Sequence, residues 1–202
     1  MDTVKLYLLD VGLVARNESA VSAYIDGDRL KKASRYVKGN DRLLSLGGGY
    51  LIKKFVGETY IDERGKPRSE TAFFNISHSG GVVGLALLKA RDIGLDIECE
   101  KEIREELVKY SLSFKEYEKY LGGEPFLSQF VAKESLAKAE GGGISNELKI
   151  IPALPLNGEV VYLGKRYARR TFVEKDLFIS VSVEGGEFKL ETVWLNETDF
   201  PS

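Results

Sequence analysis

The chain has 202 residues, of which 43% are apolar and 30% charged, and its net charge is −2. This balance is ordinary for a globular protein, and it gives no overall field that would attract nucleic acid or an anionic membrane. Cys99 is the only cysteine, which excludes an internal disulfide framework, and no apolar run approaches the ~20 residues that cross a bilayer. Since the chain also starts without a signal-peptide pattern, we expect a cytoplasmic protein.

The first part of the chain combines a strand with helices. Residues 4–9 alternate and predict a strand, and residues 18–57 have a helical pattern. The longest helix expected there contains three consecutive glycines (47–49), which disfavour a helix. Residues 58–70 are polar and contain glycine and proline, as in a loop or a short hairpin.

Three more strands and a second helical region follow. The strands are predicted at residues 72–77, 82–89 and 93–98, and the helical region at residues 101–140. The glycines at 141–143 are expected to end this region, because glycine commonly follows the last helical residue. The remaining strands are predicted at residues 148–151, 159–163, 177–183 and 188–195.

The order of strand, helices and strand hairpin therefore occurs twice. Residues 73–88 and 177–193 are alike: each has an apolar strand with alternating serines, a Gly-Gly turn and a second strand. This pattern indicates an internal duplication. We expect an α+β fold of two similar halves, residues 1–100 and 101–202, related by a pseudo-twofold axis, with a ligand cleft between them. Such a chain would be sufficient as a monomer.

Two carboxylates lie two residues apart in the strand predicted at residues 93–98. Side chains two apart on a strand point the same way, roughly 6 to 7 Å apart, so Asp96 and Glu98 share the face opposite the core. At neutral pH such a pair tends to keep one proton unless a cation lies between the two carboxylates. A solvated strand edge is the common explanation of this spacing, so a cation site needs a further ligand.

The helix predicted further along the chain offers that ligand. Glu134 and Lys138 are four residues apart and share one helix face, with Lys133 beside them. One interpretation is a surface ion pair worth about 0.3–0.5 kcal/mol. With Asp96 and Glu98, however, Glu134 would complete an oxygen-rich site that suits Mg²⁺.

The only histidine, His78, lies between Ser77 and Ser79 at the end of an apolar strand. A lone histidine is more often structural, but this place, just before two glycines, suits groups that bind a phosphate. Lys66 lies in a Gly-Lys-Pro turn, which carries little information by itself.

The motifs GKP (65–67), FNISHSG (74–80), GLDIE (94–98) and KESLAK (133–138) agree in order and spacing with one family. Between about residues 29 and 144 the chain resembles the Sfp-type 4′-phosphopantetheinyl transferases of the holo-acyl-carrier-protein synthase superfamily. The resemblance implies the paired α+β fold, with coenzyme A bound between the halves. It also implies a magnesium-dependent enzyme that transfers 4′-phosphopantetheine from coenzyme A to a serine of an apo acyl- or peptidyl-carrier protein and releases 3′,5′-ADP.

The resemblance further implies roles for single residues. Asp96, Glu98 and Glu134 match the magnesium ligands, and Glu116 matches a glutamate proposed as the base for the carrier serine. Lys138 matches a lysine near the pyrophosphate and would stabilise the departing 3′,5′-ADP. The matched contacts to coenzyme A are Arg29, Lys32, Lys66, Ser77, His78, Lys133 and Lys138.

Ser77 and His78 match the contacts to the ribose 3′-phosphate. Two other positions depart from the family pattern. The family usually has an arginine where this chain has Leu44, and the nearest cation is Arg42, so one phosphate contact is in doubt. Phe130 replaces a tryptophan, which is a conservative change in packing.

Three other interpretations are open. A non-catalytic module could bind coenzyme A or a carrier protein, but such a module could lose a metal ligand, and all three are present. A magnesium nuclease or phosphatase could use the same carboxylates, but it would not need the Ser-His strand end and the GKP loop together. The third is a structural domain with solvated charges. The sequence does not identify the carrier class, and we expect neither a nucleic acid nor a membrane as partner.

Overall fold

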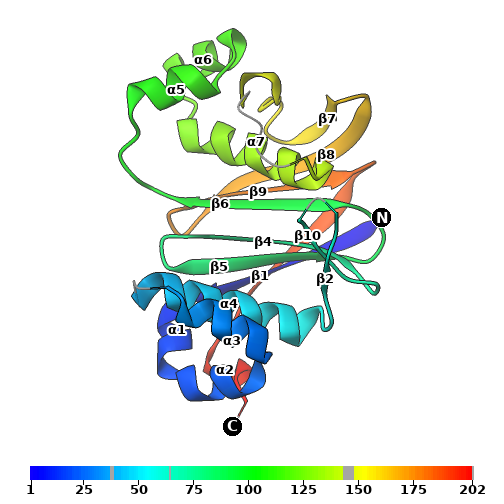
Figure 1. Cartoon of the computed structure of the whole chain (residues 1–202). Helices are drawn as coiled ribbons and strands as arrows, with labels where there is room; N and C mark the ends of the chain where they lie inside the picture. The colour runs from blue at the N-terminus through cyan, green and yellow to red at the C-terminus, as the bar shows by residue number, and fades with distance from the viewer. Residues whose placement is uncertain (37–38, 64, 143–147, 202) are drawn as a thin grey trace.

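The structure is a computed structural model that describes residues 1–36, 39–63, 65–142 and 148–201. These residues form a mixture of helices and mainly antiparallel sheets, which confirms the predicted α+β class. Figure 1 shows four layers: a helical layer, two sheets and a second helical layer. Within the described ranges, no helix combines the length and apolar character needed to cross a bilayer.

The first sheet has the strand order β10-β1-β5-β4. β1 and β4 each pair in antiparallel with β5, whereas β1 and β10 are parallel. The strands are β1 (Asp2–Asp10), β4 (Phe73–Ser79), β5 (Val82–Leu88) and β10 (Phe188–Trp194). The helices that cover the outer face of this sheet are α1 (Val11–Arg16), α2 (Glu18–Tyr24), α3 (Gly27–Ser34) and α4 (Gly39–Phe55).

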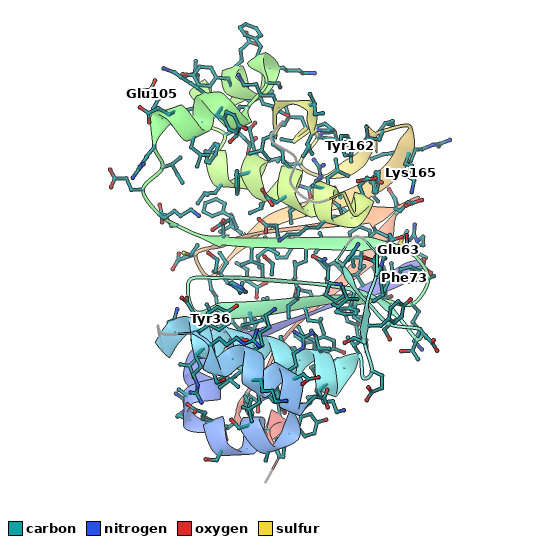
Figure 2. The ribbon with its side chains drawn as sticks, in the orientation of Figure 1. Tyr36, Glu63, Phe73, Glu105, Tyr162 and Lys165 are labelled. Atoms are coloured by element: carbon teal, nitrogen blue, oxygen red, sulfur yellow. The ribbon has the colours of Figure 1, made fainter. Side chains whose placement is uncertain are left out.

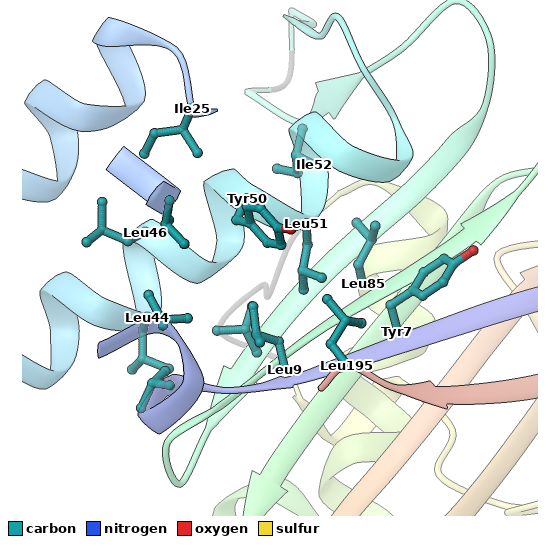
Figure 3. Packing of buried hydrophobic residues seen from close by; sticks show 14 of the residues in the cluster. Tyr7, Leu9, Ile25, Leu44, Leu46, Tyr50, Leu51, Ile52, Leu85 and Leu195 are labelled. Atoms are coloured by element: carbon teal, nitrogen blue, oxygen red, sulfur yellow. The ribbon is translucent and has the colours of Figure 1, made fainter. Parts of the chain in front are cut away.

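Helix α4 runs through its three glycines without a break. A Cβ atom on Gly48 would come within 3.2 Å of the Ile76 side chain, so the missing side chains let α4 pack closely on the sheet. Figure 3 shows the core at this contact, where Leu9, Leu51 and Leu85 are buried. Tertiary packing here outweighs the low helix propensity of glycine.

The second sheet has the strand order β6-β9-β8-β7, with antiparallel neighbours throughout. Its strands are β6 (Ile93–Cys99), β7 (Gly158–Tyr162), β8 (Lys165–Glu174) and β9 (Leu177–Glu184). Helix α7 (Phe126–Glu140) packs on its outer face. Leu6, Leu95 and Val181 are fully buried in the core between the two sheets.

The second half of the chain differs from the prediction at three places. Residues 148–151 are not a strand but contain a 3-10 turn, Leu148–Ile150, because the carbonyls of Leu148 and Ile151 accept hydrogen bonds from the buried Lys133 ammonium. Strand β8 was not predicted, since lysine and arginine interrupt its apolar pattern. The helical region 101–140 is divided into α5 (Glu105–Ser111), α6 (Phe114–Leu121) and α7. Helix α7 ends at Gly141 as expected, with φ 93°, whereas Gly143 lies outside the described residues.

The hairpin expected at residues 177–193 is also wrong. β9 is flanked by β6 and β8, so neither of its edges is available, and the chain crosses at Gly185-Gly186 to pair β10 with β1. The hairpin that corresponds to β4–β5 is β8–β9. In the first sheet β5 pairs with β1, the strand before helices α1–α4, and in the second sheet β9 pairs with β6, the strand before helices α5–α7. Of the two alternatives for residues 58–70, a loop or a short hairpin, the structure has the hairpin, formed by β2 (Tyr60–Ile61) and β3 (Pro67–Arg68).

Each sheet contains one strand from the other predicted half of the chain. β6 lies within residues 1–100 but pairs with β9, and β10 lies within residues 101–202 but pairs with β1. The boundary at residue 100 stays a prediction.

Candidate functional site

Strands β4 and β6 lie side by side where the two sheets meet, and side chains connect them. Three β6 backbone N–H groups donate to β4 side chains: Leu95 to Asn75 (3.0 Å), Ile97 to Ser77 (3.3 Å) and Cys99 to Ser79 (3.1 Å). The offset of 20 residues is constant, so the two strands run in the same direction. The polar side chains at every second residue of β4 are therefore the acceptors for the β6 backbone.

Gly94 sets the approach of helix α7 to β6. A Cβ atom there would overlap the backbone oxygen of Ser135 and the backbone nitrogen of Ala139. The glycine therefore allows the helix backbone to touch the strand, and it brings Glu134 and Lys138 to the side of Asp96.

Asp96 is buried at the centre of this junction. Its Oδ1 accepts hydrogen bonds from Lys138 Nζ at 2.6 Å and from Ser77 Oγ at 3.0 Å. Its Oδ2 is buried and has no hydrogen-bond partner among the described residues. Burial raises the pKa of Asp96, although Lys138 and Ser77 oppose the shift. Asp96 is therefore a carboxylate with one unused acceptor atom in a dry place.

Glu134 is the second buried carboxyl of the site, contributed by α7. Burial and the charge of Asp96 raise the pKa of Glu134 to about 7, although Lys138 opposes them. Perturbed carboxyls that repel each other in a confined space are typical of cation sites and acid–base sites.

Glu98 lies two residues along β6 from Asp96, on the same side of the strand. Its Oε2 accepts from Ser79 Oγ at 3.0 Å and from Lys101 Nζ at 2.7 Å. Its charge raises the pKa of both Asp96 and Glu134, so Glu98 interacts electrostatically with both carboxyls. In the part of the chain that the structure describes, no three His, Cys, Asp or Glu side chains are grouped closely enough to hold a metal. The three-ligand site therefore stays a prediction.

Two contacts of Glu98 were missed by the sequence analysis. The alternation of Asn75, Ser77 and Ser79 along β4 is a signal that could have identified Ser79. Lys101 follows the strand without any distinguishing pattern.

Lys66 lies beside Lys138 at the end of α7. Its Nζ donates to the backbone oxygen of Lys138 at 2.7 Å and lies 3.5 Å from Asp92 Oδ1. Burial lowers the pKa of Lys66, and Asp92 opposes this shift. The GKP turn thus brings a second ammonium group to the backbone of Lys138, where it also faces Asp92.

Three predicted contacts to coenzyme A line one hollow of about 170 Å³: Arg29, Lys32 and His78. Tyr36 lines it too, and Figure 2 shows this residue where the first helical layer meets the sheets. Leu44, which replaces the family's arginine, forms part of the wall. Arg42 does not line this hollow and instead forms an ion pair with Glu18 at 2.6 Å.

Ser77 and His78 are neighbours in sequence but face different places. Ser77 donates to Asp96, whereas His78 is exposed at the hollow. This follows from strand geometry, since successive side chains point to opposite faces. The structure therefore separates the two residues that the resemblance assigns to one phosphate.

Glu116 and Lys133 lie apart from the hollow, in a buried ion pair of 2.7 Å. Burial raises the pKa of Glu116, but hydrogen bonds from Lys133 and from the backbone N–H groups of Ala153 and Ser113 outweigh it and leave the pKa low. Burial lowers the pKa of Lys133, and Glu116 opposes this shift. In this conformation neither charged group reaches solvent.

A larger hollow of about 770 Å³ lies between the β4–β5 turn, the β8–β9 turn and α1. Of the described residues that line it, none is a predicted site residue. Size therefore does not identify the site, and we place the candidate site by its chemistry.

No protein-family model matches the chain, and no curated protein matches its sequence significantly. Family membership therefore stays a resemblance that rests on the four sequence motifs.

Proposed function

We propose that this protein transfers the 4′-phosphopantetheine group of coenzyme A to a serine of an apo acyl- or peptidyl-carrier protein. The observation that carries the proposal is the convergence of Asp96, Glu134 and Lys138 at the junction of β4 and β6. The basic hollow that contains His78 begins one residue from Ser77 on the same strand. Buried carboxyls and separate cations are the groups that a metal and a long polyphosphate ligand require.

The proposal includes the pseudo-twofold relation between the halves. It is supported by the equivalent strand orders β1-β5-β4 and β6-β9-β8. The ligand would lie along the seam of β4 and β6. A monomer in the cytoplasm would be sufficient for this function.

The residues of the seam suit coenzyme A in two parts. Arg29, Lys32 and His78 would bind the phosphates of its nucleotide end. Lys138, which donates to Asp96, and Lys66, which donates to the backbone oxygen of Lys138, would bind the pyrophosphate. Ser77 would act by holding Asp96, to which it donates a hydrogen bond.

The donor set also fits magnesium, since carboxylate oxygens are its preferred protein ligands and Asp96 Oδ2 is a buried acceptor to which no described residue donates. Asp96 and Glu134 would hold the ion, and Glu98 would join after leaving Ser79 and Lys101. When bound, magnesium would neutralise charge on the pyrophosphate.

In the proposed reaction the carrier serine oxygen forms a bond to the β-phosphorus of coenzyme A, and the bond from that phosphorus to the 3′,5′-ADP oxygen breaks. Lys138 would stabilise the charge that develops on the leaving oxygen. The serine proton would go to a base, for which the resemblance gives Glu116. Its carboxylate would first have to open its contacts with Lys133 and Ala153.

The test is to incubate the protein with coenzyme A, Mg²⁺ and a panel of apo-carriers and to weigh each carrier. We expect at least one carrier to gain the mass of one phosphopantetheine group. Asp96→Asn and Glu134→Gln should abolish the gain while the circular dichroism spectrum stays unchanged. Glu191→Gln, a change at an exposed residue of β10, is the matched control and should transfer normally.

Two results would contradict the proposal. One is full transfer by Asp96→Asn. The other is no mass gain on any carrier, which favours a binding module. If phosphate is released in the absence of a carrier, a nuclease or phosphatase is favoured instead.

A further inference from the structure

The two residues that flank Glu134 in helix α7 are both fully buried and polar. Lys133 and Ser135 have exposed fractions of 0%. Successive helix residues are about 100° apart around the axis, so the three side chains leave α7 in three directions. Lys133 and Ser135 are therefore placed to fix how α7 is rotated, and with it the direction of Glu134.

The Lys133 anchor joins α7 to α6 and to the segment after α7. Its Nζ lies 2.7 Å from Glu116 Oε2 and donates to the backbone oxygens of Leu148 at 3.1 Å and Ile151 at 2.5 Å. Glu116 Oε1 accepts from the Ala153 N–H at 2.7 Å. The lysine and the glutamate thus hold the same loop segment from two sides.

The Ser135 anchor joins α7 to the second sheet. Ser135 Oγ lies 2.9 Å from the hydroxyl oxygens of both Ser180 and Ser182 on β9. All three serines are fully buried.

Arg169 on β8 connects the two anchors. Its Nη1 donates to the Ala153 oxygen at 2.7 Å, its Nη2 to the Pro152 oxygen at 2.9 Å, and its Nε to Ser182 Oγ at 3.4 Å. The guanidinium is 1% exposed, and although burial lowers the pKa of Arg169 to about 10, the group stays charged at neutral pH. A polar path therefore runs from Lys133 through Glu116, Ala153, Arg169 and Ser182 to Ser135.

We propose that Arg169 is a positioning residue for Glu134. Arg169 closes the buried network whose two ends hold α7 on either side of the glutamate, and so it fixes where the Glu134 carboxylate lies relative to Asp96. The inference rests on the proposed function, since it concerns the same carboxylate site. Arg169 donates to backbone oxygens and to Ser182, so it acts on Glu134 through other residues.

The test measures metal binding directly, by calorimetric titration of Mn²⁺ without coenzyme A or carrier, together with the melting temperature. Arg169→Met should weaken Mn²⁺ binding roughly tenfold or more, as expected when a residue that orients a metal ligand is lost. Arg169→Lys, which keeps the charge but cannot reach several acceptors at once, should fall between Arg169→Met and the wild type. Leu51→Ala is the control, because Leu51 is fully buried in the first helical layer and should lower the melting temperature while leaving Mn²⁺ affinity near the wild-type value.

Equal loss of melting temperature in Arg169→Met and Leu51→Ala, with unchanged Mn²⁺ affinity in both, would show that the network is only structural and would overturn the inference. If Arg169→Met does not fold, Ser182→Ala replaces it and carries the same expectation with a smaller loss. Failure of the proposed function is distinguishable, because the wild type itself would then show neither Mn²⁺ binding nor carrier modification.

Discussion

The state of Glu134 connects the site to the stability of the protein. Its carboxyl has a pKa of about 7 in the fold, raised first by burial and then by Asp96, against an ordinary value of 4.5. Between these two values the folded protein holds a proton that the unfolded chain has released. The contribution of Glu134 to the free energy of unfolding is therefore fully present below about pH 4.5 and is lost as pH rises through about 7. The pKa of Asp96 is also raised, so it contributes with the same sign.

We expect the wild type to lose on the order of 3 kcal/mol between pH 5 and pH 8 without divalent metal, since each pKa unit corresponds to about 1.4 kcal/mol. Glu134→Gln stays neutral and should lose much less. Urea unfolding at the two pH values measures the difference, and Glu191→Gln should behave like the wild type. Equal losses in Glu134→Gln and the wild type would show that Glu134 is not the group concerned.

For single residues, the sequence predicted which side chains share one side of a strand, but it did not predict which side chains are buried. The D-x-E spacing predicts that Asp96 and Glu98 share one side of β6, and their contacts with Ser77 and Ser79 confirm this. The burial of Lys133 could not be predicted, because α7 is buried on almost all sides and shows no polar face from which its orientation could be read. A helix of this kind gives no amphipathic signal.

The contact of α7 with β6 is the element-level feature on which the site depends. Gly94 allows this contact, because any Cβ there would strike the helix backbone. Backbone cannot move aside as a side chain can, so the helix itself would have to shift.

Gly94→Ala should therefore destabilise the protein by about 1–3 kcal/mol or more, and the shift of α7 should also weaken metal binding at Glu134. Thermal unfolding and Mn²⁺ titration measure the two effects. Gly186→Ala is the matched control, since no atom of the described residues lies within 4 Å of a Cβ there and the change should be nearly neutral. Wild-type stability in Gly94→Ala would contradict the close packing of α7 on β6.

The elements of the first half could be predicted better than those of the second. Apolar runs closed by turn or charged residues identified β4, β5 and β6, of which β4 carries serines, β6 carries carboxylates and β5 is apolar and almost wholly buried. The pattern failed at residues 148–151, whose backbone oxygens accept hydrogen bonds from a lysine side chain of another element, helix α7. A local pattern carries no information about such a partner.

Strand β10 crosses from the second half of the chain to the first sheet and so joins the two halves. β1 is paired on one edge with β5 and on the other with β10, from the far end of the chain. The predicted hairpin at residues 177–193 was wrong for this reason, because a Gly-Gly turn has the same local sequence whether the next strand stays in the sheet or leaves it.

We expect a fragment of residues 1–100 not to fold alone, since β1 would lose one neighbour and β6 would lose β9. Circular dichroism and thermal unfolding of the fragment should show no cooperative transition, whereas the full chain should unfold in a single step. Joining residues 186–201 to the fragment through a flexible linker restores the β10 pairing and should recover part of the structure. A cooperative transition in the 1–100 fragment alone would show that the halves are independent.

The most direct measurement is a crystal structure with coenzyme A and Mn²⁺ in place of Mg²⁺, in which anomalous scattering locates the metal. We predict one metal bound to Asp96 and Glu134 and touching the pyrophosphate, with the nucleotide end at Arg29 and His78. A metal elsewhere, or coenzyme A in the larger hollow beside Trp194, would contradict the proposed site.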